Sequence, residues 1–459
     1  MKQKTNQDRL HELATVGVGC LLWRYSVPSV IGMLVMALYN VVDRVILGQV
    51  VGPTAIAGLT VTFPVMNLTT AIGVLVGVGA CSRVSILLGE KRFYDAGRVL
   101  GNALVLTLIN GAIYLALFAI FMDDLLLLFG ASPATLPYAR DFMMWILPGL
   151  LMINLSFGFN NIMRASGYPI KAMFTMIIGA GLNIVLAPVF VYWLDMGIKG
   201  AAIATDISMF ISMTFVMAHF ASKKSTLHFS RGIYGLRLRT IWAIISIGAA
   251  PSIVNAASCL INIIINHALY ANGGDNAIAT AGIFVTYTSL ITTVVLGLNM
   301  GMQPILGYNY GAGNLGRLKR TLLLASFTAT LICTLGQIGG QLAPDMIARA
   351  FSGDSTLISV TAASLPVAMT CFFTVGIQII STGFFQSIGK AGKSIILSLT
   401  RQVLFLIPLL LTLPSMFGLR GVWMSFPASD VCAFCVTVLL LWIQLRSLER
   451  NSMPAAAAR

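Results

Sequence analysis

Gly52-Pro53-Thr54-Ala55-Ile56-Ala57 recurs 222 residues later as Gly274-Asp275-Asn276-Ala277-Ile278-Ala279. The same shift lays Gly167-Tyr168-Pro169-Ile170-Lys171 on Gly389-Lys390-Ala391-Gly392-Lys393, and a shift of 221 residues lays Gly197-Ile198-Lys199-Gly200 on Gly418-Leu419-Arg420-Gly421. These matched stretches indicate that one unit is present twice. Duplication in an apolar chain is typical of secondary transporters, in which two similar bundles move around a site between them.

The composition predicts an integral membrane protein. Hydrophobic residues make up 57% of the chain and charged residues 10%, against about 25% charged in an average soluble domain. Twelve apolar windows are each long enough to cross a hydrocarbon core of about 30 Å. They are residues 22–48, 54–82, 95–122, 135–158, 169–193, 199–221, 240–270, 276–307, 318–344, 357–384, 394–415 and 420–445. We expect an all-α fold of twelve transmembrane helices in two pseudo-symmetric six-helix lobes.

Charge sets the expected topology. Lys and Arg gather in alternate connections, and the long connection 222–239 alone holds five of them. By the positive-inside rule both termini are cytoplasmic. The net charge of +14 is then a topology signal, and no nucleic-acid partner is expected. The expected divisions are a cytoplasmic N-terminus (1–21), an N-terminal lobe (22–221), a cytoplasmic linker (222–239), a C-terminal lobe (240–446) and a cytoplasmic tail (447–459).

The sequence offers no catalytic constellation. No connection is long enough for a soluble catalytic domain, and the chain has only four His. Cys432 and Cys435 have CxxC spacing, but they lie in an apolar helix without a second pair, which favours packing over metal binding. The polar first twenty residues do not resemble a removable signal peptide. We therefore predict neither an enzyme nor a metal or organic cofactor.

Three carboxylates fall within the spans: Asp43, Asp206 and Asp430. A charge inside the bilayer costs at least about 2.5 kcal/mol on insertion scales, so each is a functional candidate. Counted from the outer helix ends, Asp43 lies about 8 Å deep and Asp206 about 10 Å deep. Thr205 and Asn183 lie at similar depth. A carboxyl group in such a dry pocket can hold a proton near neutral pH and release it when water enters.

Other residues carry weaker expectations. Tyr39 and Asn40 lie one turn before Asp43 and are the candidates for the substrate cavity. Pro28 removes a backbone donor in the first helix and should act as a hinge there. Arg401 is either a counterion within the C-terminal lobe or a substrate contact. For Asp43 the alternative is a structural hydrogen bond in a helix contact.

Three features together resemble a known family: Asp43 late in the first helix, residues 161–167 (NIMRASG) after the fourth, and residues 302–312 (MQPILGYNYGA) at the end of the eighth. The chain resembles the multidrug and toxic compound extrusion (MATE) transporters over residues 20–447. Within them it resembles the DinF-like branch, where it looks most like the MepA group. The resemblance implies a central cavity with alternating access. It also implies export of organic cations and amphiphilic compounds by antiport with H+ or Na+, by a monomer in the bacterial inner membrane.

The same resemblance implies roles for single residues. In the DinF-like branch an Asp on helix 1 joins an Asn and an Asp on helix 5 and a Thr on helix 6. Asp43, Asn183 and Thr205 match this cation-coupling network, whereas the second Asp falls on Ala187. Asp206 is the candidate that replaces the missing charge.

The C-terminal lobe departs from another branch of the family. The NorM-like branch has acidic residues on helices 7 and 10, where this chain offers Asn255, Ser258, Thr374 and Gln378. A Na+ site of that type is not expected, which leaves Asp430 as a possible second cation site.

The alternatives are a lipid-linked precursor flippase of the wider superfamily, a channel and a membrane enzyme. Resemblance to a flippase of this kind would imply more helices than twelve and a cationic cavity. A channel would need a continuous polar pore, whereas the polar residues here cluster in separate lobes.

Overall fold

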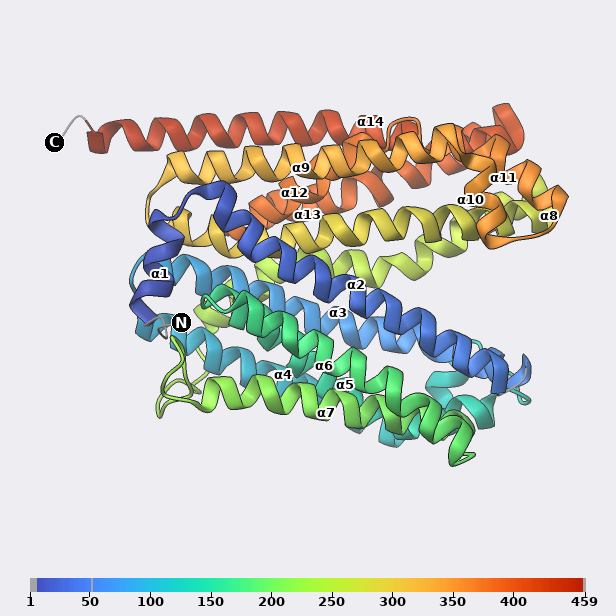
Figure 1. The fold of residues 1–459 in the computed structure, drawn as a ribbon, viewed down its shortest axis with the longest axis horizontal. Helices are drawn as coiled ribbons and strands as arrows, with labels where there is room; N and C mark the ends of the chain where they lie inside the picture. Colours follow the sequence, from blue (N-terminus) through green and yellow to red (C-terminus); the bar gives the residue numbers. More distant parts are fainter. Residues whose placement is uncertain (1–5, 51–52, 457–459) are drawn as a thin grey trace.

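The computed structural model describes residues 6–50 and 53–456, so Gly52 of the first repeat motif lies outside the described residues. The protein consists of two groups of helices that lie side by side, and both termini lie at one end (Figure 1). We call this the terminal end. A short helix, α1 (Asn6–Thr15), lies across it.

The first lobe is built from α2 to α7. The elements are α2 (Val18–Val50), α3 (Pro53–Gly89), α4 (Phe93–Leu128), α5 (Leu136–Ala165), α6 (Pro169–Pro188), the π-helical turn η1 (Val189–Trp193) and α7 (Gly197–Ala221). Most outlast the predicted apolar windows by several residues at one or both ends, because a helix can continue past the hydrocarbon core.

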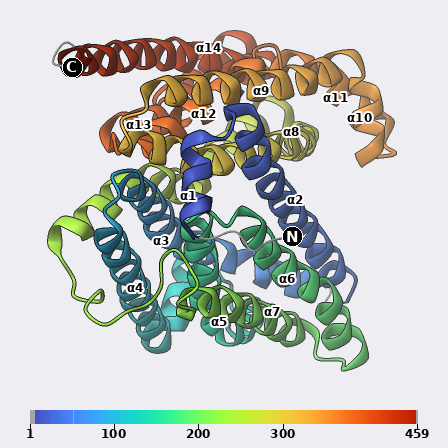
Figure 2. The ribbon, with the colours of Figure 1, turned by 60° about the vertical axis from the view of Figure 1, so that its left-hand side comes forward.

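The second lobe is built from α8 to α14. Its elements are α8 (Leu238–Gly311), α9 (Leu315–Leu342), α10 (Pro344–Phe351), α11 (Ser355–Ala368), α12 (Phe373–Ser387), α13 (Ala391–Leu399), the π-helical turn η2 (Thr400–Leu406) and α14 (Ile407–Ala456). Figure 2 shows α9 and α14 on the side of the molecule farthest from α5 and α7.

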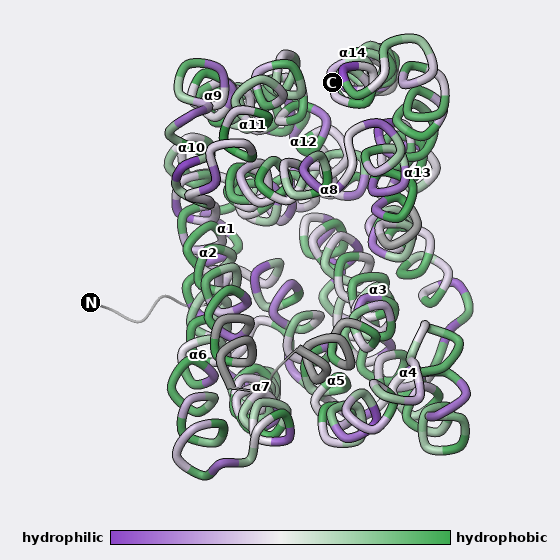
Figure 3. Tube along the Cα trace, turned by 90° about the vertical axis from the view of Figure 1, so that its right-hand side faces the viewer, coloured by the Kyte–Doolittle hydropathy of each residue, from purple (hydrophilic) through white to green (hydrophobic). Residues whose placement is uncertain are grey.

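The described residues confirm the twelve expected spans. Nine helices are long and apolar enough to cross a membrane, or ten when α11 and α12, bent by 57°, count as one broken span. Two of these are double, because α8 is interrupted at Gly274 and α14 at Gly418, where the backbone is not helical. Viewed along the helices, every helix carries hydrophobic residues over much of its length (Figure 3).

Matched turns show the duplication in three dimensions. Gly167 and its repeat partner Gly389 have φ of +95° and +72°, and Gly197 and Gly418 have φ of +54° and +58°. These left-handed conformations favour glycine because it has no Cβ. The repeated glycines therefore reverse the chain at corresponding points of the two lobes.

Glycines also bring the lobes together near the terminal end. A Cβ on Gly79 of α3 would lie 2.0 Å from the carbonyl oxygen of Ile244 in α8, and one on Gly301 of α8 would lie 2.5 Å from Cα of Ser26 in α2. A Cβ on Gly248 would lie 1.8 Å from the Leu75 carbonyl oxygen. Only glycine permits this backbone approach. The lobes are thus closely packed in the half of the molecule that carries the termini.

Candidate functional site

Polar side chains from three helices meet in the first lobe. The Asn183 amide on α6 donates a hydrogen bond of 2.8 Å to Oγ1 of Thr205 on α7, and both side chains are buried. The Thr205 hydroxyl donates to the Ala201 carbonyl at 3.0 Å. Tyr39 on α2 lies within interaction range of both Thr205 and Asp43. The structure therefore brings four predicted residues into one cluster, which we call the N-lobe site.

Asp206 lies beside this cluster and faces another helix. Its Oδ1 would be 1.8 Å from a Cβ on Gly149 of α5, so the carboxylate packs directly on that glycine. This Oδ1 is buried and has no hydrogen-bond partner among the described residues. Neighbouring helix residues point about 100° apart, which explains why Asp206 does not follow Thr205 toward Asn183.

Ala187, where the resemblance places a second Asp, lies in an apolar environment. It is fully buried in a hydrophobic cluster that includes Val191, Ala201 and Ala204. A carboxylate at this position would lose its hydration without a cation beside it in the cluster. The environment of residue 187 is thus suited to the alanine that the chain has.

The two remaining predicted residues of α2 have different surroundings. Asn40 is exposed, and its amide donates to the Met36 carbonyl at 2.9 Å. Pro28 is buried, and α2 continues through it as one helix. Pro28 lies between Ser26 and Val30, the two residues of α2 on which glycines of α8 pack backbone to backbone. The proposed hinge therefore coincides with the contact between the lobes.

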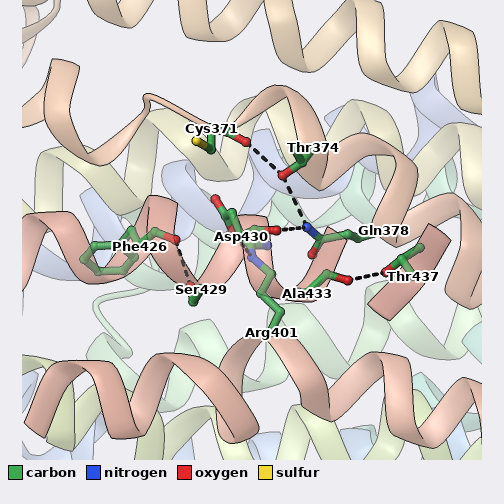
Figure 4. Close-up of polar contacts among 9 residues, drawn as sticks. All are labelled: Cys371, Thr374, Gln378, Arg401, Phe426, Ser429, Asp430, Ala433 and Thr437. Atoms are coloured by element: carbon green, nitrogen blue, oxygen red, sulfur yellow. Dashed lines mark hydrogen bonds and ion pairs between the residues drawn. The ribbon is translucent and has the colours of Figure 1, made fainter. Parts of the chain in front are cut away.

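The second lobe contains a buried ion pair (Figure 4). Nε of Arg401, in η2, donates to Oδ1 of Asp430, in α14, at 2.7 Å. Asp430 is 2% exposed, and the Arg401 side chain is 29% exposed. The structure thus places Arg401 as the counterion of Asp430. A π-helical turn adds a residue to the helix and changes which way side chains point, and such turns are frequent at functional sites.

Polar groups of the broken helix complete this cluster. The Gln378 amide on α12 donates to the Asp430 carbonyl at 2.9 Å and to Oγ1 of Thr374 at 3.3 Å (Figure 4). The Thr374 hydroxyl donates to the Cys371 carbonyl at 2.8 Å, in the break between α11 and α12. From the sequence, Thr374 and Gln378 stood out only as positions that lack acids. Pro366, late in α11, is the local signal that could have indicated the break.

Comparisons with known proteins agree with this architecture. The model of the MatE family matches residues 28–189 and 247–412, one match in each lobe. The chain is 28% identical over 426 residues to the multidrug export protein MepA of Staphylococcus haemolyticus, covering 93% of this chain and 94% of that protein. It is 28% identical over 432 residues to a protein of Shewanella oneidensis named FAD transporter, with the same coverage.

A solved structure has the same fold as this chain. It is the outward-facing conformation of a multidrug resistance MATE family transporter of the MOP superfamily, with a TM-score of 0.91 and 25% sequence identity. The match covers 98% of this chain and 100% of that one.

Proposed function

Because the chain belongs to the MatE family, whose members are transporters rather than enzymes, we propose that it exports organic cations and amphiphilic compounds from a bacterial cell. Export is driven by antiport with H+ or Na+. The protein works as a monomer in the inner membrane, since one chain supplies both lobes.

The observation that carries this proposal is the N-lobe site. An acid of α2 lies with a tyrosine, an asparagine and a threonine from three different helices. These partners are neutral and able to hydrogen-bond, so they can hold Asp43 in either of its charge states. When a cation binds to the carboxylate, α2 changes its contacts with α6 and α7. Such a change can be transmitted along α2 to the contact between the lobes around Pro28.

The expected topology orients the closed end. Both termini lie at the end where glycines bring the lobes together, and the positive-inside rule places this end in the cytoplasm. On that topology the packed half faces inward, and we infer an outward-facing state for the chain. The likeness to an outward-facing transporter supports this assignment.

The relative named FAD transporter suggests a second candidate substrate class. FAD is an anionic dinucleotide. The observation that favours this class is the guanidinium of Arg401, which is partly exposed within the spans while its Nε is held by Asp430. The first candidate has the support of the N-lobe carboxylate.

Transport into everted membrane vesicles tests these proposals. We expect a cationic dye to collapse a preformed pH gradient or Na+ gradient only when the protein is present, and the gradient that collapses identifies the coupling ion. Uptake of FAD without any response to cationic dyes would favour the second candidate. Scrambling of a lipid-linked precursor without either response would support the flippase alternative and overturn export.

A further inference from the structure

A basic cavity lies between the lobes at the terminal end, away from the N-lobe site. Its volume is about 390 Å³, and it is lined by residues from the end of α3, from α4 and from the start of α8 with the connection before it. Five arginines and one acidic residue face it: Arg83, Arg92, Arg98, Arg237, Arg239 and Asp95. The cavity thus concentrates positive charge that the two lobes contribute jointly.

Most of this charge is not neutralised within the protein. Arg92 pairs with Glu90 at 3.1 Å and with Asp95 at 2.8 Å. No ion pair in the described part of the chain engages the other four arginines. Nε of Arg98 is buried without a hydrogen-bond partner, and its guanidinium lies 5.7 Å from the centre of the Tyr94 ring. Like charges brought together in this way repel each other unless an anion lies between them.

A clamp of hydrogen bonds from Asn102 joins α4 to the connection before α8, beside the cavity. The buried Asn102 amide on α4 donates to the carbonyls of Ile233 and Gly235, at 3.3 and 3.1 Å, and its Oδ1 accepts from the Arg237 backbone N–H at 3.1 Å. A Cβ on Gly101 would lie 2.4 Å from the Ile233 carbonyl oxygen. The connection is therefore fixed against α4, next to the residues Arg237 and Arg239 that line the cavity together with Arg98.

The composition of the walls favours a phosphate-bearing amphiphile. Guanidinium groups bind phosphate oxygens in bidentate fashion. Leu87 and Val99 add apolar surface to the cavity, and Trp242 beside them is 70% exposed, as an aromatic residue at the membrane interface would be. Basic pockets between transmembrane helices at this level bind lipid head groups.

We propose that this cavity binds the phosphate of an anionic phospholipid head group. Because Arg98 lies in α4 of the first lobe and Arg239 in α8 of the second, a head group bound between them holds the lobes together at the terminal end. This consequence for transport rests on the proposed function, whereas the binding itself does not. The lipid would favour the state that the structure shows and would leave when the lobes separate there.

Thermal unfolding of the purified protein in detergent tests the site without any transport measurement. Short-chain phosphatidylglycerol should raise the Tm, and the same concentration of short-chain phosphatidylcholine should not. Arg98→Gln with Arg237→Gln should weaken the response to phosphatidylglycerol at least about tenfold, because charged hydrogen-bonded contacts are lost. Arg237→Gln alone should weaken the response to phosphatidylglycerol less. Because Arg237 is exposed, this single variant should fold even if the double variant does not, so it still tests the site.

Arg320→Gln is the matched control. This exposed arginine of α9 lies at the same end, outside the cavity, so its loss should leave the response unchanged. An equal response in wild type and in both cavity variants overturns the proposal. A response to inorganic phosphate that equals the response to phosphatidylglycerol overturns the assignment to lipid.

Discussion

The two lobes share their turns and their mutual contact but not their polar sites. A shift of 222 residues takes Asp43 to Ile265 and Asn183 to Phe405, and a shift of 221 takes Thr205 to Phe426. Each residue of the N-lobe site thus has an apolar counterpart. By the same shifts Arg401 and Asp430 correspond to Gly179 and Met209, which also adjoin: a Cβ on Gly179 would lie 3.7 Å from Cε of Met209.

The contact between the lobes has been kept, in contrast. Gly79 and Gly301 are repeat partners, and each brings its helix against the backbone of the opposite lobe. The duplicated frame therefore supports two independent polar sites. One carries an acid among neutral partners, and the other carries an acid with its counterion. We expect the first to serve transport and the second to serve stability.

The largest expected effect concerns the C-lobe pair. Arg401→Gly leaves the buried Asp430 without its counterion and should cost about 3 kcal/mol or more of stability. Adding Asp430→Met, which installs both residues of the first lobe, should recover most of that loss. Thermal unfolding in detergent measures both variants. A stable double variant that no longer transports would contradict the division of roles and make Asp430 a second cation site.

The lobe contact should tolerate no side chain at Gly248. In Gly248→Ala the new Cβ meets the Leu75 carbonyl. Overpacking of this kind costs about 1–3 kcal/mol, which lowers the population of the closed arrangement by roughly 5-fold to 150-fold. Export of a cationic dye should fall accordingly. Gly282→Ala, in the same helix with open space around it, is the control. Equal rates for the two variants would show that this contact does not limit transport.

Within the first lobe, the next prediction concerns the role of Asp206 in export. If it supplies the charge that Ala187 lacks, Asp206→Asn should impair export. Ala187→Asp in that background should recover part of it, because the apolar surroundings of residue 187 can accommodate a carboxyl group in its neutral form. The two acids Asp43 and Asp206 would then titrate as a coupled pair, so their substitutions should not add. Dye export and its pH profile are measured in all four combinations of residues 187 and 206. An unchanged rate and profile in Asp206→Asn would make it a structural residue.

The smallest expected effect is at Pro28. Its substitution by alanine restores a backbone donor to α2 at the lobe contact. If bending there accompanies the change between states, Pro28→Ala should slow turnover more than it weakens substrate binding. Turnover at saturating substrate and dye affinity are compared with those of wild type. Equal turnover would show that Pro28 does not act as a hinge in transport.

The sequence predicted the helices and the repeat well because both depend on local signals. Long apolar windows and paired glycines determine where spans begin and end. The meeting of Asn183 with Thr205 could be expected from equal depth on neighbouring helices. The Arg401–Asp430 pair could be considered only as one of two options, because the π-helical turn sets where Arg401 points.

Contacts that join distant segments were beyond the sequence. The clamp from Asn102 to the connection at 233–237 depends on backbone carbonyls, which every residue has. The orientation of Asp206 toward Gly149 depends on how α5 and α7 pack. Neither leaves a pattern in the residue types themselves.

The most direct test compares two modes of transport in proteoliposomes that contain Asp43→Asn. An inward proton gains about 2.3 kcal/mol per 100 mV, which drives export only if a group on the protein takes it up. If Asp43 takes up the coupling ion, the variant still exchanges labelled for unlabelled substrate across the membrane, whereas an imposed ion gradient no longer drives accumulation. Accumulation at the wild-type rate would show that the N-lobe acid does not couple the ion to export.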